Sequence, residues 1–251
     1  MCIRDRIGAD NIVLDGQNYT GSYTGLNGSY RGLIRMPTTY KNVTIRGINI
    51  DATGKLCVRG AGWVVGSYFA KGGSSVSTYV IENCSSNGNI SPKAGGIVGY
   101  FANCGSSSSK RCSGTIEISY CYSTGSIDHL GGGILGAYSN YGYNTTTTTT
   151  IIRNCYVATN TIYSSVNPDA DLAGTIAGAG LGVSNKGKVE IKNNYIVTTT
   201  YYEYYPTTTS TIITLSNNKK DTQWNDANAK LTIGDPTNTN WLDLDLSLIH
   251  I

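Results

Sequence analysis

Apolar and polar residues alternate in several short segments of the chain. The pattern is clearest at 43–45 (Val-Thr-Ile), 116–118 (Ile-Glu-Ile) and 189–191 (Val-Glu-Ile). A period of two residues is typical of a β-strand that buries one of its faces. Nowhere do apolar residues recur at helical spacing over three turns, and no apolar run approaches the roughly 18 residues that a membrane-spanning helix needs. The pattern predicts an all-β chain in which the isoleucines face inward.

The alternating segments belong to a repeat. Equivalent points near the ends of these segments are Ile48, Cys84, Cys121, Cys155 and Asn194. They are separated by 36, 37, 34 and 39 residues, so the loops of the repeat vary in length. A glycine-rich element, G-x-x-x-G, alternates with the strands at 62–66, 95–99, 132–136 and 174–178.

A single repeat has too little apolar surface to fold alone. Stacked copies pair their backbone edges at a spacing of about 4.8 Å and build one continuous core. We therefore predict a right-handed parallel β-helix (β-solenoid) of about five repeats over 7–220. The segment 221–245 is expected to be a C-terminal cap or the start of a further segment, because exposed sheet edges need protection.

The two ends of the chain differ from everything between them. Residues 1–6 and 246–251 look like translations of the transposase-end DNA used in sequencing libraries. We expect both to be non-native additions and exclude them from the fold prediction. The chain is then expected to be a fragment of a longer gene.

Strand alternation predicts that one polar column points into the solenoid. The position two residues after each inward isoleucine is occupied by Asn83, Asn154 and Asn193. Stacked amides can bond one another and the turn backbone, so we predict a buried asparagine ladder, which Tyr120 and Gly47 interrupt.

The next position of the repeat is occupied by Cys84, Cys121 and Cys155. We interpret these cysteines as a column of small buried side chains, since Asn194 fills the same position in a later copy. Cys104 and Cys112 differ because they flank a serine-rich insertion, and we predict a disulfide between them in an oxidising compartment. We expect no zinc site, because the chain lacks histidines near the cysteines.

The repeat resembles the Glug-motif family, whose hallmark is I-x-N-C-Y-x-T-G-x-I followed by G-G-I/L-V-G. The best matches are 79–100, 116–137 and 150–178. The resemblance implies a glycine-rich β-solenoid of the kind found in bacterial or protist cell-surface proteins, adhesins and non-catalytic regions of secreted peptidases. It implies no conserved catalytic residues.

Charge and composition narrow the choice of partners. The net charge is +3, 14% of residues are charged, and the basic residues form no cluster, so we expect no nucleic-acid partner. Few charges together with many hydroxyl and amide side chains fit a secreted or cell-surface location. We expect no cofactor.

Candidate catalytic groups are few. Glu117 and Glu190 face outward in one register, with Thr150 holding that position in the coil between them, so we interpret them as solvated residues. Asp169 and Asp171 could bind calcium, but ordinary turn chemistry is the favoured explanation. His129 has no nucleophile placed by a motif. A carbohydrate-active β-helix enzyme, a lyase or a hydrolase, is therefore kept as an alternative only.

Tyrosines supply the candidate ligand-binding residues, because exposed aromatic rings can stack on sugars. They form two strings, which are Tyr201, Tyr202, Tyr204 and Tyr205, and Tyr138, Tyr141 and Tyr143. Covering the end of the solenoid is the favoured explanation of the first string. The sequence thus favours a non-enzymatic extracellular module for adhesion or ligand binding, with glycans or cell-surface proteins as partners, and a passive stalk as a further alternative.

Overall fold

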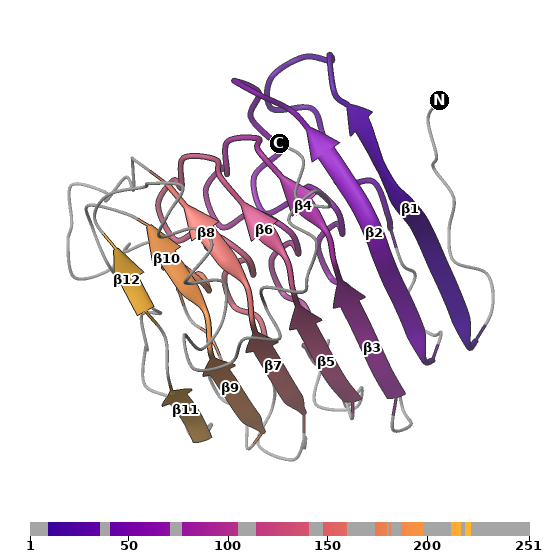
Figure 1. Cartoon of the computed structure of the whole chain (residues 1–251), viewed down its shortest axis with the longest axis vertical. Helices are drawn as coiled ribbons and strands as arrows, with labels where there is room; N and C mark the ends of the chain where they lie inside the picture. Colours follow the sequence, from indigo (N-terminus) through magenta and orange to yellow (C-terminus); the bar gives the residue numbers. More distant parts are fainter. Residues whose placement is uncertain are drawn as a thin grey trace.

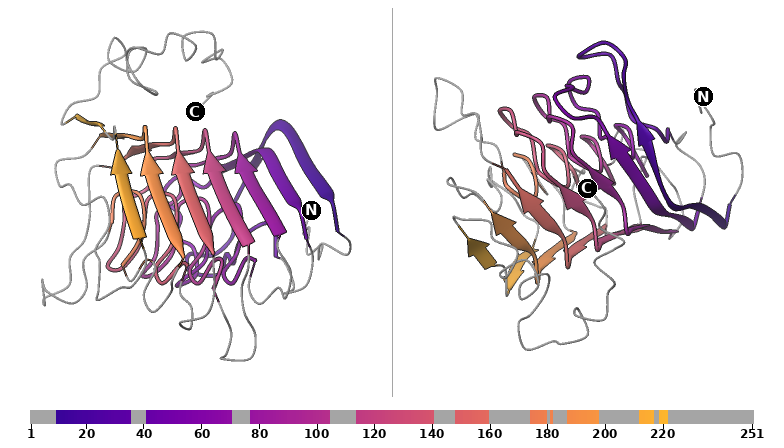
Figure 2. Two further views of the ribbon diagram at one scale, coloured as in Figure 1. Left: turned by 90° about the horizontal axis from the view of Figure 1, so that it is seen from below. Right: turned by 45° about the horizontal axis from the view of Figure 1, so that its top comes forward.

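The alternating segments form the strands of a parallel β-solenoid. The computed structural model describes residues 10–35, 41–70, 77–104, 114–140, 148–159, 174–179, 181 and 187–197, together with the backbone of 212–216 and 219–221. All regular elements in these residues are strands, and their coils stack in chain order (Figures 1 and 2). The predicted all-β solenoid is confirmed.

The first sheet takes one strand from each coil. In spatial order its strands are β1 (Ile12–Ser22), β2 (Val43–Asp51), β3 (Ser77–Glu82), β5 (Gly114–Ser119), β7 (Thr149–Arg153), β9 (Lys188–Lys192) and β11 (Ile212–Ser216). Every pairing is parallel, and the register stacks Ile45, Ile81, Ile118, Ile152 and Ile191 in one column. Each of these isoleucines is fully buried, so the predicted inward column is confirmed.

The second sheet begins with the C-terminal half of β2. It continues through β4 (Ser85–Ser86), β6 (Tyr122–Ser123), β8 (Tyr156–Ala158), β10 (Tyr195–Val197) and β12 (Lys219–Asp221). The glycine-rich elements close the third side of each coil through isolated parallel bridges, such as Val65 to Val98 and Val98 to Leu135. Each coil therefore has three sides around one apolar core.

The number of coils differs slightly from the prediction. The five predicted repeats correspond to β2, β3, β5, β7 and β9, and the described residues add β1 before them and β11 after them. β1 has only a weak repeat pattern, because its chain contains an irregularity between Asp15 and Tyr19.

The corner between the first two sheets is a column of left-handed residues. Its φ values are +62° at Gly47, +50° at Asn83, +55° at Tyr120, +57° at Asn154 and +54° at Asn193. Asparagine and glycine favour this conformation, which explains the residue types found there.

The predicted asparagine ladder is wrong for Asn83, whose side chain is exposed. A left-handed residue turns the chain and breaks the alternation of the strand, so the following residue points inward instead. That residue is Cys84, which is 1% exposed. Asn154 is buried and Asn193 half-buried, but both occupy the same corner rather than an inward strand position.

Glycine on the third side lets neighbouring coils approach closely. A Cβ atom at Gly133 would lie 2.2 Å from the carbonyl oxygen of Thr175 in the next coil and 2.7 Å from a methyl group of Val157. Gly132 is equally confined, since a Cβ atom there would meet the carbonyl oxygen of Leu135 at 2.1 Å. The repeated glycines are therefore required by the packing of the backbone.

Gly133→Ala should destabilise the protein by about 2 kcal/mol or more, because neither the Thr175 carbonyl nor the core can move aside freely. Gly21→Ala is the matched control, since its Cβ atom would come no closer than 3.9 Å to the nearest atom. Urea unfolding followed by circular dichroism measures both. Equal midpoints for the two variants would contradict the packing argument.

Candidate functional site: an aromatic strip on one corner

Aromatic side chains line the corner that follows each glycine-rich element. Tyr68, Phe101 and Tyr138 stand at equivalent positions of three successive coils, each in the left-handed region with φ between +52° and +62°. The chain turns at this residue. Because the turn is the same in each coil, the rings lie directly above one another.

The rings form a stack along the solenoid axis. The centroids of Tyr68 and Phe101 are 5.6 Å apart with an angle of 8° between the planes, and those of Phe101 and Tyr138 are 5.4 Å apart at 22°. Tyr100 packs edge-on against Tyr68 at 4.9 Å, and the two hydroxyl groups share a hydrogen bond of 2.6 Å. We call these four half-buried residues, Tyr68, Tyr100, Phe101 and Tyr138, the aromatic strip.

Among the described residues, Lys93 places a cation beside the strip. The ammonium group of Lys93 lies 5.3 Å from the centroid of the Tyr138 ring, at a distance typical of a cation–π interaction. Desolvation and the hydrogen bond to Tyr100 raise the pKa of Tyr68 to about 12. The Tyr68 hydroxyl group therefore stays protonated at physiological pH. The strip presents ring edges, hydroxyl groups and the ammonium group of Lys93.

Rigid backbone supports the strip from below. A Cβ atom at Gly60 would lie 2.6 Å from the Tyr100 ring, so only glycine leaves room for it. Asn103 and Asn140 follow the strip and are 1% and 0% exposed. The Asn103 amide donates to the carbonyl oxygens of Gly114 at 3.3 Å and Thr149 at 3.2 Å, which ties the corner to neighbouring strands.

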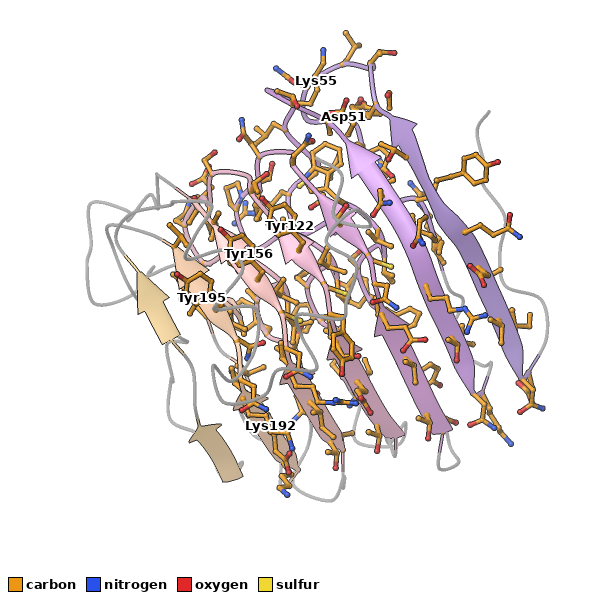
Figure 3. The ribbon with its side chains drawn as sticks, in the orientation of Figure 1. Asp51, Lys55, Tyr122, Tyr156, Lys192 and Tyr195 are labelled. Atoms are coloured by element: carbon orange, nitrogen blue, oxygen red, sulfur yellow. The ribbon has the colours of Figure 1, made fainter. Side chains whose placement is uncertain are left out.

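A second tyrosine column lies on the outer face of the second sheet. Tyr122, Tyr156 and Tyr195 come from β6, β8 and β10 and form a row across the strands (Figure 3). Their centroids are separated by 4.8 and 5.5 Å. They are only 8%, 2% and 3% exposed, so this column contributes to packing and is not an accessible surface.

Of the predicted ligand-binding tyrosines, the described residues include Tyr138 alone, and it belongs to the aromatic strip. The others lie outside the described residues, namely Tyr141, Tyr143, Tyr201, Tyr202, Tyr204 and Tyr205. Sequence reasoning missed Tyr68, Tyr100 and Phe101. The signal was present, because an aromatic residue follows the last glycine of the G-x-x-x-G element within one to three positions in all three coils.

The cysteine column lies inside the solenoid. Cys84, Cys121 and Cys155 are each 1% exposed, and their thiols donate to backbone carbonyl oxygens at 3.2 to 3.4 Å. Burial and the two neighbouring thiols raise the pKa of Cys121 well above its usual value. Asn194 continues the column and accepts a hydrogen bond from the Cys155 amide at 2.8 Å. The described residues contain no group of three side chains arranged to hold a metal ion.

The buried thiols should be unreactive until the chain unfolds. In the native protein we expect DTNB to label Cys84, Cys121 and Cys155 far more slowly than in urea, because each sulfur is covered. Mass spectrometry of the labelled peptides identifies the sites. Rapid native labelling of any of the three would contradict the buried column.

The predicted disulfide is only partly described. Cys104 is 1% exposed at the start of the insertion, and Cys112 lies outside the described residues, so the pairing stays a prediction. In chain produced in an oxidising compartment, a linked Cys104–Cys112 peptide should appear in a non-reduced digest, whereas Cys57 should be recovered as a free alkylated thiol. Recovery of alkylated Cys104 and Cys112 as separate peptides would contradict it.

Glu117 and Glu190 on the first sheet are held in ion pairs. Glu117 accepts from Nε of Arg153 at 2.8 Å, and Glu190 pairs with Lys188 and Lys192, which lower the pKa of its carboxyl group. The prediction that Thr150 lies between the two glutamates is wrong.

Ile151 occupies that outward position between Glu117 and Glu190, and Thr150 is buried opposite Ile116. The alternation was offset by one residue in this coil. His129 pairs with Asp128 at 2.8 Å and is half-buried. Asp169 and Asp171 lie outside the described residues.

Comparison with known proteins found no match for this chain. The chain matches no family model, no curated protein and no solved structure. The resemblance to Glug-motif repeats therefore rests on the sequence pattern alone. Within the residues that the structure describes, no helix is long and apolar enough to cross a membrane.

Proposed function

We propose that the chain is a non-enzymatic extracellular or cell-surface module that binds a ligand, with adhesion as its role and the aromatic strip as its contact surface. The observation that carries this proposal is the half-exposed stack of Tyr68, Phe101 and Tyr138, which continues over three coils. Aromatic residues gathered at loops on a rigid scaffold are typical of recognition surfaces.

The chemistry of the strip favours a ligand that is partly apolar and rich in hydroxyl groups, such as a glycan. The ring faces of the stack lie against one another, so a ligand would contact ring edges and the polar groups around them. The hydroxyl groups of Tyr68 and Tyr100 and the ammonium group of Lys93 could then form hydrogen bonds with it. Surface proteins with the same exposed groups are the second partner class.

The secreted or cell-surface location is supported by the sequence. The resemblance to Glug-motif repeats, the low charge and the predicted Cys104–Cys112 disulfide point the same way. A rigid repeat with parallel pairing throughout would also suit a stalk, so the binding experiment is designed to distinguish the two roles.

A carbohydrate-active enzyme would need carboxylates that converge in one groove. The arrangement on the first sheet does not favour this alternative. Glu117 and Glu190 lie on strands separated by β7, and each is held by basic side chains. These contacts support the non-enzymatic proposal.

The decisive experiment is a glycan-array binding assay on the folded chain. Tyr138→Asn and Phe101→Asn should each weaken binding at least about tenfold, since they remove part of the stack. Asparagine is chosen because it tolerates the left-handed conformation of both positions. Circular dichroism and thermal unfolding confirm that the variants remain folded.

Tyr120→Asn is the matched control, because Tyr120 is also half-buried and left-handed but lies at the corner between the first two sheets. A second variant changes Tyr201, Tyr202, Tyr204 and Tyr205 to alanine and tests the other predicted tyrosine string. Binding that survives both strip variants would reject the strip as the contact surface. No binding by the folded chain to glycans or to cell surfaces would favour the stalk.

A further inference from the structure

A row of turn residues on the third side runs beside the aromatic strip. The carbonyl oxygen of Gly60 accepts a hydrogen bond from the Tyr100 amide at 2.9 Å, and the carbonyl oxygen of Lys93 accepts one from the Ala137 amide at 3.0 Å. Lys93 therefore holds in its coil the position that Gly60 holds in the coil before. Each of the two meets the next coil where the strip begins.

Two cations belong to this row. Arg59 directly precedes Gly60, and its side chain is exposed. Lys93 is half-buried and places its ammonium group 5.3 Å from the centroid of the Tyr138 ring. Because the row repeats from coil to coil, the backbones of the two cations lie on neighbouring coils, which are about 4.8 Å apart along the solenoid axis.

Arg31 continues the row in an earlier coil. A Cβ atom at Gly66 would lie 2.8 Å from the carbonyl oxygen of Arg31, and one at Gly136 would lie 2.8 Å from that of Lys93. Gly66 and Gly136 are both the last glycine of the G-x-x-x-G element, so Arg31 holds the position of Lys93 two coils earlier. The row of Arg31, Arg59 and Lys93 therefore runs alongside the strip over three coils.

The positive charge of this row is not neutralised by nearby acids. In the first four coils the third side and the strip are formed by 28–35, 56–70, 89–104 and 126–140. These segments contain one acidic residue, Asp128, whose carboxylate accepts a hydrogen bond from the His129 amide at 2.7 Å and lies 2.8 Å from Nδ1 of the same residue. Among the described residues, neither Arg59 nor Lys93 forms an ion pair, whereas the described cations on the strands of the first sheet are paired with acids.

The strip leaves ring edges and hydroxyl groups accessible rather than ring faces. Tyr68, Phe101 and Tyr138 cover one another's faces, with centroids 5.4 to 5.6 Å apart. Single-stranded nucleic acids gain affinity from bases that stack on open aromatic faces, so this arrangement does not favour them. A glycan that carries carboxylates needs hydroxyl partners and cations, and a guanidinium group matches a carboxylate with two parallel hydrogen bonds.

We propose that the aromatic strip binds an acidic glycan, a polysaccharide with carboxylate groups along its chain, and that Arg59 and Lys93 bind those carboxylates. The glycan lies along the solenoid axis, with its hydroxyl groups against those of Tyr68 and Tyr100. The cations and the rings have the same repeat, so each coil offers one cation and one aromatic position to the ligand. This assignment of the ligand class rests on the ligand binding proposed above.

Matched polysaccharides test the proposal. Polygalacturonate, alginate and hyaluronan are each titrated into the full chain beside their fully methyl-esterified forms, which keep the sugar backbone and lose the charge. We expect at least one acidic form to bind at least about tenfold more tightly than its ester at low salt. The difference should shrink as added salt screens the charges.

Substitutions locate the contact. Arg59→Gln and Lys93→Gln should each weaken binding of that acidic form about threefold or more and leave any binding of the ester unchanged, with folding checked by circular dichroism. Lys192→Gln is the matched control, because it removes the same charge at the corner between the first two sheets, where Lys188 still pairs with Glu190 (Figure 3). It should leave both affinities unchanged.

Equal affinities for each acidic form and its ester, or acidic binding that survives both substitutions, would overturn the proposal. Binding of a single-stranded oligonucleotide of the same charge as tightly as any acidic glycan would also overturn it. A chain that binds neutral glycans in the array but none of the acidic forms would reject the acidic class and leave the proposed function intact. A folded chain that binds no glycan and no cell surface would contradict both.

Discussion

Parallel stacking in constant register is the constraint on which the whole structure depends. Each coil pairs with the next through backbone hydrogen bonds, so the spacing between equivalent residues is set by the sheet and not by their side chains. Side chains at equivalent positions of successive coils must therefore fit beside one another at that fixed distance. Isoleucine fills the column of Ile45 to Ile191 because branched side chains stack well on a pleated face, and glycine fills positions such as Gly133 because the neighbouring carbonyl leaves no space for a Cβ atom.

The same constraint turns each corner into a column. A corner residue in the left-handed region is repeated in the next coil, so residues that tolerate positive φ appear at equal intervals. Asparagine and glycine do so readily at Asn83, Asn154 and Gly47. Aromatic residues occupy the same conformation at Tyr68, Phe101 and Tyr138, where the cost of the backbone is offset by stacking between rings. Stacking between the rings thus stabilises a row of surface residues whose backbone conformation is individually unfavourable.

The strand columns could be predicted from the sequence, and the corners could not. A period of two identifies Ile118 and Ile191 as inward residues, and the spacing of the repeat identifies the solenoid. The alternation fails wherever a left-handed residue intervenes, which is why Asn83 is exposed while Cys84 is buried. It fails again where the strand was aligned one residue off, at Thr150 and Ile151. The aromatic strip was missed for a related reason, because its rings are equivalent only when the coils are aligned on the glycine-rich element.

The candidate site lies at a corner because corner residues are less confined by neighbouring coils than the residues of the inward columns are. Inward columns are confined by neighbours above and below, so substitutions there act on stability, and thiols such as Cys121 are unavailable for chemistry. Side chains at the corners contact the protein on one side and solvent on the other. The residue type can therefore vary at positions such as Tyr68 and Tyr138 while the backbone stays in register. The aromatic strip therefore arises from the same stacking that builds the core, because each of its rings already packs against the ring of the neighbouring coil.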